Sequence, residues 1–328
     1  MAMGGKTPKV SVCIPTRNCA QFLEQAVSSV LGQDYRDLEV VIVDNCSTDN
    51  TESLVRGMVL RDRRIRYYHN ERDLGLIGNL NKCIKYAGGE YIKYVLADDI
   101  LLPGCFMKMV RCLDEHPSVV LATAGRLIVD QHGQPLALRR YSAKPEIVPG
   151  PEAIQRCLFG ANYIGEPTAV MFRKRDAARG FREDLAQLTD MEMWFYLLER
   201  GSLFSIPDPL CAIRQHAGQL TNANVQSGAL VEDNIILFDE YRQKPYIKQT
   251  TLRMTKHKLR MAYRIWFSRK YLLSERRRSI IKSYSSCLAY YVLMPSMSVV
   301  LYLGRLVQHV FIRWRYRVLN GTRPENCD

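Results

Sequence analysis

The sequence predicts an α/β fold in which a mostly parallel central sheet is flanked by helices and is followed by a helical C-terminal extension. Strand and helix signals alternate through the first half of the chain, which is typical of βαβ units. The last third of the chain instead combines a long uncharged run with many basic residues. We therefore expect one domain over residues 1–225 and an extension over residues 226–328.

The first predicted strand covers residues 10–14 and stops at Pro15, after which apolar residues recur at helical spacing over residues 22–31. Residues 38–43 are the second predicted strand. The next helix is expected to have Asp49 as its N-cap, because Glu52 lies three residues further on, as in a capping box.

A short third strand is predicted over residues 65–68, and a helix over residues 79–87 is closed by two glycines. An apolar strand then ends abruptly in Asp98 and Asp99. Because adjacent carboxylates repel each other, we expect them at an exposed sheet edge, where a divalent metal is the simplest neutralising partner. The second strand likewise runs into Asp44, and ligands of open α/β sheets bind at the carboxyl ends of strands. These acidic strand ends predict one shared site.

Charge is unevenly distributed along the 328 residues. Residues 241–328 carry 19 Lys and Arg against 3 Asp and Glu, whereas residues 1–240 carry 27 against 30. None of the ten cysteines forms a Cys-x-x-Cys pair and several lie in apolar runs, which indicates reduced thiols in a cytosolic protein. The N-terminus lacks the apolar run of a signal peptide. A disulfide framework is therefore not expected.

Two nucleotide-binding motifs are not supported by the sequence. Residues 4–7 imitate the end of a P-loop but lack its leading glycine and the preceding strand. No Gly-x-Gly-x-x-Gly follows a predicted strand, which disfavours a dinucleotide-dependent oxidoreductase.

The order and spacing of short motifs over roughly residues 8–222 resemble family 2 glycosyltransferases. Each motif is weak alone, and together they are VSVCIPTRN (10–18), VVIVDNCSTDNT (40–51), DLG (73–75) with Asn79, GGEYI (88–92), ADD (97–99), GEPT (165–168), GF (180–181), TDMEMW (189–194) and IRQH (213–216). The resemblance implies the nucleotide-diphosphosugar transferase fold called GT-A. It also implies inverting sugar transfer from a nucleotide donor.

By this resemblance the first strand ends hold the donor, with Asp44 accepting a hydrogen bond from a base N–H. Asp49 ranks below Asp44 because it can equally serve as a helix N-cap. The donor-binding residues that the resemblance implies are Pro15, Thr16, Arg17, Asp44, Asn79 and Asp98.

The leaving nucleoside diphosphate accumulates negative charge, which a divalent ion held by carboxylate oxygen neutralises as a Lewis acid. Asp99 and His216 are the expected ligands of Mn²⁺ or Mg²⁺. Where the family often places a further acid, this chain has Leu96. The sequence leaves open whether Asp98 or Asp99 binds the metal.

Direct displacement at the anomeric carbon needs a base for the acceptor hydroxyl. Asp190 is the expected base, in the first turn of a helix that a capping box from Thr189 to Glu192 begins. Glu192 is then expected to be structural, and Trp194, in an apolar helical run, to belong to the core. Glu166 is the expected contact on the acceptor side.

The basic tail predicts contact with a membrane. Residues 283–304 are uncharged and long enough to span a bilayer, but five serines, a central proline and basic residues on both sides disfavour a single span. Apolar residues at helical spacing from Val299 to Trp314 suit an amphipathic helix on an anionic surface. A helix packed on the domain, or on a second copy in a homodimer, is the alternative.

The expected function is transfer of a sugar to a hydroxyl of a glycan or lipid-linked acceptor in cell-surface polysaccharide synthesis, at the inner face of the cell membrane. A non-catalytic nucleotide-sugar-binding protein is one alternative. A nucleic-acid-binding protein using the basic tail is another, although the apolar run within the tail and the acidic strand ends argue against a nucleic-acid partner. The sequence does not identify the donor base, the sugar or the acceptor.

Overall fold

A ten-stranded mixed sheet forms the centre of the molecule in the computed structural model, which describes residues 7–267. Its strand order is β3-β2-β1-β4-β9-β6-β10-β5, with β7 paired to β6 and β8 paired to β10. The strands are β1 Val10–Thr16, β2 Leu38–Asp44, β3 Ile65–His69, β4 Tyr91–Tyr94, β5 Ile100–Leu101, β6 Val119–Val129, β7 Pro135–Arg139, β8 Glu146–Val148, β9 Val170–Arg173 and β10 Ser202–Arg214.

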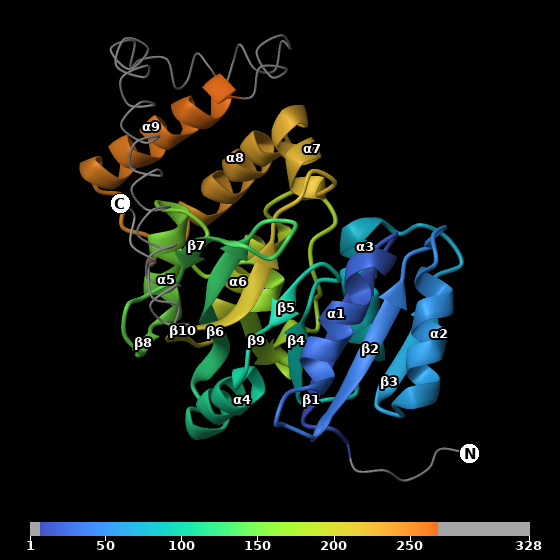
Figure 1. Cartoon of the computed structure of the whole chain (residues 1–328). Helices are drawn as coiled ribbons and strands as arrows, with labels where there is room; N and C mark the ends of the chain where they lie inside the picture. Colours follow the sequence, from blue (N-terminus) through green and yellow to red (C-terminus); the bar gives the residue numbers. More distant parts are fainter. Residues whose placement is uncertain (1–6, 268–328) are drawn as a thin grey trace, which may run out of the picture.

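Helices flank this sheet, which confirms the predicted α/β fold class (Figure 1). The helices are α1 Ala20–Leu31, α2 Thr51–Arg61, α3 Gly75–Tyr86, α4 Cys105–Glu115, α5 Gly150–Leu158, α6 Thr189–Leu198, α7 Leu220–Ser227, α8 Ala229–Tyr241 and α9 Thr251–Phe267, with two 3-10 turns, η1 Pro167–Ala169 and η2 Lys174–Ala177. None of the helices within residues 7–267 is long and apolar enough to cross a bilayer.

The sheet is parallel from β1 to β4, the part for which the sequence predicts βαβ units. Strand β1 pairs in parallel with β2 and β4, and β2 pairs in parallel with β3. Strands β1 and β2 are buried along their whole length, which explains their nearly unbroken apolar sequence. Beyond β4 the sheet becomes mixed, because β9 runs antiparallel to both β4 and β6 while β10 runs parallel to β6.

Two local predictions are wrong. Strand β1 does not stop at Pro15 but pairs with β2 as far as Thr16, since a proline near a strand end removes only one N–H from the ladder. Helix α2 begins at Thr51 without a capping box. Glu52 instead accepts hydrogen bonds from Arg56 one turn later, and Asp49 accepts from the N–H of Thr51 at 3.0 Å.

Helix α8 packs against the domain that precedes it. The buried carboxylate of Asp233 in α8 accepts hydrogen bonds from the backbone N–H groups of residues 186, 187 and 188 at 3.0, 2.6 and 2.9 Å. Phe238 meets Phe159 of the α5 end edge to face. Helices α8 and α9 lie at the side of the molecule remote from β3 (Figure 1). Within the described residues, the fold therefore continues past residue 225.

The eight cysteines of the described residues are all free, as the sequence predicted. The uncharged run over residues 283–304 and the apolar stripe from Val299 to Trp314 lie outside the described residues.

Candidate active site

A pocket of about 510 Å³ lies where the turn after β4 meets the end of β10. It brings together the predicted metal residues and the predicted acceptor contact, although they are far apart in sequence. Its lining consists of Leu96, Asp98, Asp99, Arg139, Glu166, Ile213, Arg214, Gln215, His216, Ala217, Gln219 and Thr221.

Asp99 is the buried member of the acidic pair, with 1% of its surface exposed. Its Oδ2 accepts a hydrogen bond from the Thr168 hydroxyl at 2.5 Å, and its Oδ1 accepts from the backbone N–H of Arg214 at 3.0 Å. Burial, and then the neighbouring charge of Asp98, raise the pKa of Asp99 well above its usual value. This carboxyl therefore lacks a full counter-charge in the protein alone.

Asp98 is the more accessible member. Its Oδ2 lies 3.1 Å from Nε2 of His216 and 3.3 Å from the side-chain amide of Gln219. The side chains of Asp98 and His216 are 17% and 18% exposed, so both reach the pocket surface. Within residues 7–267, neither Asp98 nor Asp99 forms a salt bridge with a lysine or arginine.

Arg214 ties the two halves of the pocket together, a role that the sequence analysis did not assign. Its buried guanidinium donates to the Asp98 carbonyl at 3.0 Å and to the Gln131 carbonyl at 3.0 Å. A third bond, at 2.8 Å, reaches the Gln25 side chain on α1. Both its backbone and its side chain therefore hold the acidic turn in place.

Of the predicted donor residues, Pro15, Thr16 and Asp44 lie at the carboxyl ends of β1 and β2, whereas Asp98 lines the pocket described above, whose lining includes none of the other predicted donor residues. Asp44 is fully buried, and its Oδ1 and Oδ2 accept from the Ser47 N–H and the Tyr67 hydroxyl, both at 2.9 Å. Thr16 is 2% exposed, and its hydroxyl has no hydrogen-bond partner among the described residues. The neighbouring Pro15 is also buried.

Arg17 and Asn79 occupy different surroundings at this end of the sheet. Arg17 is half exposed and pairs with Asp73. Asn79 is buried, where its amide donates to the Val43 carbonyl at 2.9 Å and accepts from Asn70 at 3.0 Å. Asn79 therefore stabilises the end of β2 from within the core.

Further polar residues, which the sequence analysis did not single out, join the loops above β1 and β2. Asn18, with a positive φ of 51°, accepts from the Thr48 N–H at 2.8 Å. Asn45 accepts from the Leu74 N–H at 2.9 Å and donates to Asp73 at 2.6 Å. A clue was the dense run of Asn, Asp, Ser and Thr at positions 44–51, which favours turns that bond their own backbone.

Asp190 lies in the first turn of α6, as predicted. It is partly exposed, and its Oδ1 and Oδ2 accept from the Met191 N–H at 2.6 Å and from the Asn162 side chain at 3.1 Å. Burial raises the pKa of Asp190 to about 7, and the nearby Glu166 carboxylate adds to the increase. A carboxyl with this pKa suits proton transfer near neutral pH.

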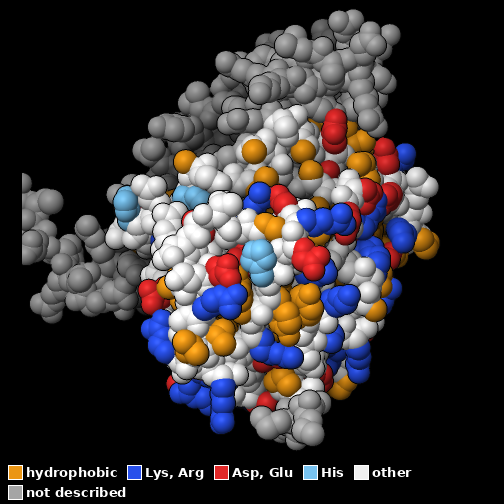
Figure 2. Space-filling model, turned by 90° about the vertical axis from the view of Figure 1, so that its right-hand side faces the viewer, with side chains coloured by type: hydrophobic (Ala, Val, Ile, Leu, Met, Phe, Trp, Pro, Cys, Tyr) orange, Lys and Arg blue, Asp and Glu red, His pale blue; other side chains and the backbone are white. Residues whose placement is uncertain are grey.

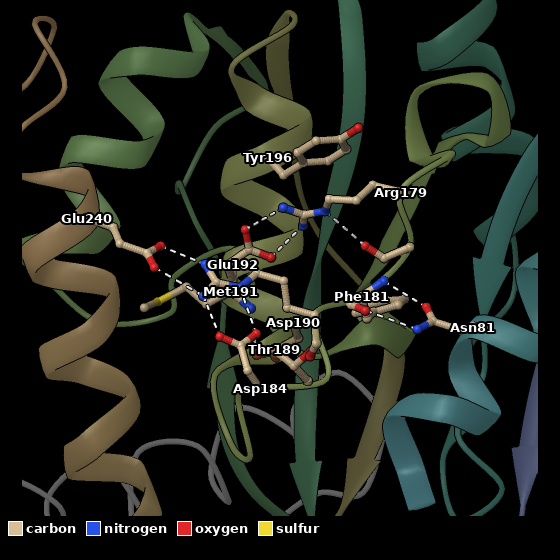
Figure 3. A network of polar contacts seen from close by, with 12 residues as sticks. Asn81, Arg179, Phe181, Asp184, Thr189, Asp190, Met191, Glu192, Tyr196 and Glu240 are labelled. Carbon is tan, nitrogen blue, oxygen red and sulfur yellow. Dashed lines mark hydrogen bonds and ion pairs between the residues drawn. The ribbon is translucent and has the colours of Figure 1, made fainter. Parts of the chain in front are cut away.

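The capping box predicted for α6 is wrong, although Glu192 and Trp194 have the structural roles expected. Glu192 is buried and forms a two-pronged ion pair with Arg179, at 2.8 and 2.5 Å (Figure 3). The helix start is held instead by Asp233 from α8, which no local pattern could reveal. Trp194 is fully buried in the core.

Glu166 sits between two arginines at the pocket wall. Its Oε2 pairs with the buried guanidinium of Arg126, and its Oε1 lies 3.8 Å from that of Arg139, which is half exposed. The pocket lining includes Glu166 but not Asp190, which joins the same loop through Asn162.

Residues 11–181 match the family model described as Glycosyl transferase family 2. The GalNAc(5)-diNAcBac-PP-undecaprenol beta-1,3-glucosyltransferase of Campylobacter jejuni is 28% identical over 198 residues, which cover 60% of this chain and 62% of that protein. The chain therefore spans less than two thirds of that relative's length.

Two solved structures have the same fold. S. aureus TarS 1-349, in complex with UDP-GlcNAc, aligns with a TM-score of 0.62 and 20% identity over 82% of this chain and 77% of that one. The mannosyltransferase PcManGT of Pyrobaculum calidifontis, in complex with GDP-Man and Mn²⁺, aligns with a TM-score of 0.60 and 17% identity over 97% and 89%. These similarities confirm the GT-A type of fold.

Proposed function

The chain belongs to glycosyl transferase family 2, and we propose on that premise that it moves a sugar, with inversion at the anomeric carbon, from a nucleotide-diphosphosugar to a hydroxyl of a glycan or lipid-linked acceptor. The observation that carries the proposal is the single pocket where Asp98, Asp99, His216 and Glu166 converge at the strand ends of a GT-A fold. Cell-surface polysaccharide synthesis is the proposed setting, since one relative is named for an undecaprenol-linked acceptor.

The donor is proposed to lie across the carboxyl ends of β1 and β2, above Pro15 and Thr16 and beside Arg17. The unpartnered hydroxyl of Thr16 supports this placement, because a base N–H or ribose hydroxyl would supply a partner there. Asp44 is buried, and its two oxygens already accept from the Ser47 N–H and the Tyr67 hydroxyl, so a contact with the base would use a further lone pair. Asn79 supports the site from below through Val43. The nucleobase of the donor is not assigned, because the two structural neighbours hold donors with different bases.

The pocket contains carboxylate and imidazole groups of the kinds that bind divalent ions, although within residues 7–267 no three His, Cys, Asp or Glu side chains are arranged to hold an ion by themselves. Carboxylate oxygens are the ligands that Mg²⁺ and Mn²⁺ prefer, and Mg²⁺ is commonly held by one or two carboxylates together with substrate phosphates. Burial, and then the neighbouring charge of Asp98, raise the pKa of Asp99, and a cation beside it would favour its ionised form. We propose that Asp98, Asp99 and His216 hold the ion. When bound, it would stabilise the negative charge of the leaving diphosphate.

The proposed reaction is a single displacement. Asp190 accepts the proton of the acceptor hydroxyl, whose oxygen forms a bond to the anomeric carbon as the bond to the diphosphate oxygen breaks. The electron pair of the broken bond leaves with the diphosphate, so charge and atoms balance. Glu166 faces the pocket on the acceptor side, where its carboxylate can accept hydrogen bonds from sugar hydroxyls.

Thermal unfolding in a panel of nucleotide sugars tests the proposal. One donor is expected to raise the Tm with Mn²⁺ present and to raise it much less in EDTA, because ligand binding to the folded state stabilises it. Incubating that donor with a lipid-linked glycan should then release nucleoside diphosphate and lengthen the glycan by one sugar. If no nucleotide sugar changes the Tm in either condition, the proposed donor site is wrong.

The basic tail is proposed to attach the enzyme peripherally to an anionic membrane at the cytoplasmic face. On the face shown in Figure 2, basic and acidic side chains are intermixed, in keeping with the small net charge of residues 1–240. Replacing Arg276, Arg277 and Arg278 by Gln in the full chain should weaken binding to vesicles of anionic phospholipid several-fold at low salt. Each basic residue near such a surface contributes about 1 kcal/mol, less as salt screens it.

Vesicle sedimentation measures this effect. The control carries the same change in charge at three exposed arginines of the folded part, Arg61, Arg63 and Arg111, and should bind as the parent chain does. Equal losses in the two triple variants would contradict a dedicated tail contact and favour the packed-helix or homodimer alternative. Any shortened chain made to remove the tail should be cut after α8, because Asp233 of α8 accepts hydrogen bonds from the backbone at the start of α6.

A further inference from the structure

The loop over residues 162–168 connects the predicted base to the predicted metal residues. At its first residue, Asn162 donates from Nδ2 to Oδ2 of Asp190 at 3.1 Å. At its last, the Thr168 hydroxyl donates to Asp99 at 2.5 Å and accepts from the Leu96 N–H at 3.0 Å. The buried ammonium of Lys93 donates to the Thr168 carbonyl at 2.5 Å, which fixes this end of the loop.

The amide of Asn162 has a defined orientation. Its Oδ1 accepts from the Gly165 N–H at 2.9 Å, so its NH₂ group must face Asp190. A flipped amide would place an oxygen against the Asp190 carboxylate and lose both bonds. The side chain of Asn162 thus presents a donor, and never an acceptor, to the base.

A buried arginine holds the same loop from beneath. Arg126, whose side chain is 3% exposed, donates to the carbonyls of Asn162 and Tyr163 at 3.2 and 3.3 Å and pairs with Glu166. Gly165 adopts a φ of +111°, and a Cβ there would lie 2.7 Å from the guanidinium carbon of Arg126. Trp194 donates to the Gly165 carbonyl at 2.9 Å. The loop therefore has little freedom to move Asn162 away from the base.

We propose that Asn162 is a positioning residue for Asp190, which orients the carboxylate and favours its ionised form by donating to Oδ2. This inference rests on the proposed role of Asp190 as the base. With the Met191 N–H on Oδ1, each carboxylate oxygen has one fixed donor, and a proton-accepting lone pair remains on each. The reaction needs the ionised form, so the amide acts on the rate without contacting either substrate.

The charged groups that face Asp190 are compatible with a positioning role for Asn162. Glu166, ahead of η1, raises the pKa of Asp190, whereas Arg126 of β6 lowers it. These two groups pair with each other, and Arg139 of β7 lies on the far side of Glu166. Glu192 lies two residues after Asp190 in α6, and so does not face it, and it is engaged by Arg179. Within residues 7–267, Asn162 is the side chain that hydrogen-bonds Asp190 directly.

The test compares three variants of the full-length chain by the pH dependence of kcat. Asn162→Asp keeps the size and the acceptor for Gly165 but sets a second carboxylate against Asp190, so the apparent pKa of the rate should rise by about one unit or more. Asn162→Ala should lower kcat about tenfold with the KM for donor unchanged. Asn81→Asp is the matched control, since Asn81 also clamps a loop through one amide, at the Phe181 N–H and carbonyl (Figure 3).

Asn81→Asp should leave the pH profile where it is in the parent chain. A profile of Asn162→Asp that superimposes on that of Asn81→Asp overturns the inference, and so does a normal kcat in Asn162→Ala. Donor-induced stabilisation reports folding in each case, and Asn162→Ala carries the test alone if the charged variant does not fold. Asp190→Asn tests the proposed base separately from the proposed positioning residue. Retained transfer in that variant would reject Asp190 as the base, whatever the Asn162 variants show.

Discussion

Asp190→Asn is expected to lower the rate of sugar transfer by about two or more orders of magnitude while donor affinity stays nearly unchanged. The substitution keeps the shape of the side chain and an oxygen for the Met191 N–H, but it removes the group that takes the proton. Single-turnover transfer measures the rate, and donor-induced stabilisation measures binding. A protein that only senses nucleotide sugars would keep its function in this variant, so the measurement separates the enzyme from that alternative.

The same carboxyl predicts how the parent enzyme responds to pH. With a pKa of about 7, Asp190 is protonated and inactive as a base in acid, so kcat should rise as the pH increases through 7 and then level off. Because its pKa is raised above the usual value, its ionisation also opposes folding, and this penalty grows as the pH rises from about 4 to about 7. Asp190→Asn should lack this loss of stability.

Asp184→Asn is the matched control for both effects. Asp184 lies six residues before Asp190, is largely exposed and pairs with Arg182, which lowers the pKa of Asp184. Its substitution should leave the rate and the pH profile unchanged. A comparable fall in both variants would show that the Asp190 result reflects general damage near α6.

Residues along continuous motifs could be predicted from the sequence, because their geometry follows from local structure. The apolar run before Asp98 and Asp99 predicts that both follow a strand, and Asp190 lies in the first turn of α6 as its local sequence predicts. The expected exposed sheet edge is wrong for Asp99, because β4 ends at Tyr94 and Asp99 is buried in the following turn, where it accepts from Thr168 and the Arg214 N–H. The convergence of Asp98 with His216 over 118 positions rested on the family resemblance, because nothing in the periodicity brings β4 and β10 together. The structure shows that β5, β6 and β9 supply that connection.

The two incorrect capping-box predictions share one physical cause. The two capping boxes at Glu52 and Glu192 were inferred from local spacing, but each glutamate found an arginine instead, one turn away in the first case and in a neighbouring loop in the second. A guanidinium offers a charge-assisted, two-pronged bond that a single backbone N–H cannot match. The caps that do form, such as Asp233 on residues 186–188, come from distant segments.

The roles of Arg126 and Asn162 could not be predicted from local sequence patterns either. Arg126 lies in a β-strand with apolar neighbours, and only the folded loop shows that it supports Gly165 and Glu166. Asn162 precedes the recognised motif by three positions, and its partner Asp190 is 28 residues away. Long-range polar contacts of this kind depend on the tertiary fold, which determines the partner of each buried donor.

Donor binding is expected to depend on metal through the acidic pair. Asp99→Ala should weaken nucleotide-sugar binding by more than an order of magnitude in Mn²⁺ and much less in EDTA, because it removes a proposed ligand of the ion that would neutralise the diphosphate charge. Isothermal titration in the two buffers gives the four affinities that are needed. Equal affinities of the parent and the variant in both buffers would contradict a metal site at this pair.

The structure allows the roles of the two aspartates to be separated. Asp99 also holds Thr168 and the Arg214 N–H, so Asp99→Ala can disturb the pocket itself. Asp99→Asn removes the charge and keeps the shape: its single oxygen can accept from the Arg214 N–H, and its NH₂ group then faces the Thr168 hydroxyl, whose oxygen can accept. Asp98 bonds His216 and Gln219 at the pocket surface, so Asp98→Asn changes the accessible carboxylate with little effect on the core. The aspartate that binds the ion is the one whose Asn variant binds the donor with the same affinity in Mn²⁺ and in EDTA. If both Asn variants keep the difference in affinity between Mn²⁺ and EDTA in full, the ion lies elsewhere and the acidic pair serves to hold the turn between β4 and β5 against the end of β10.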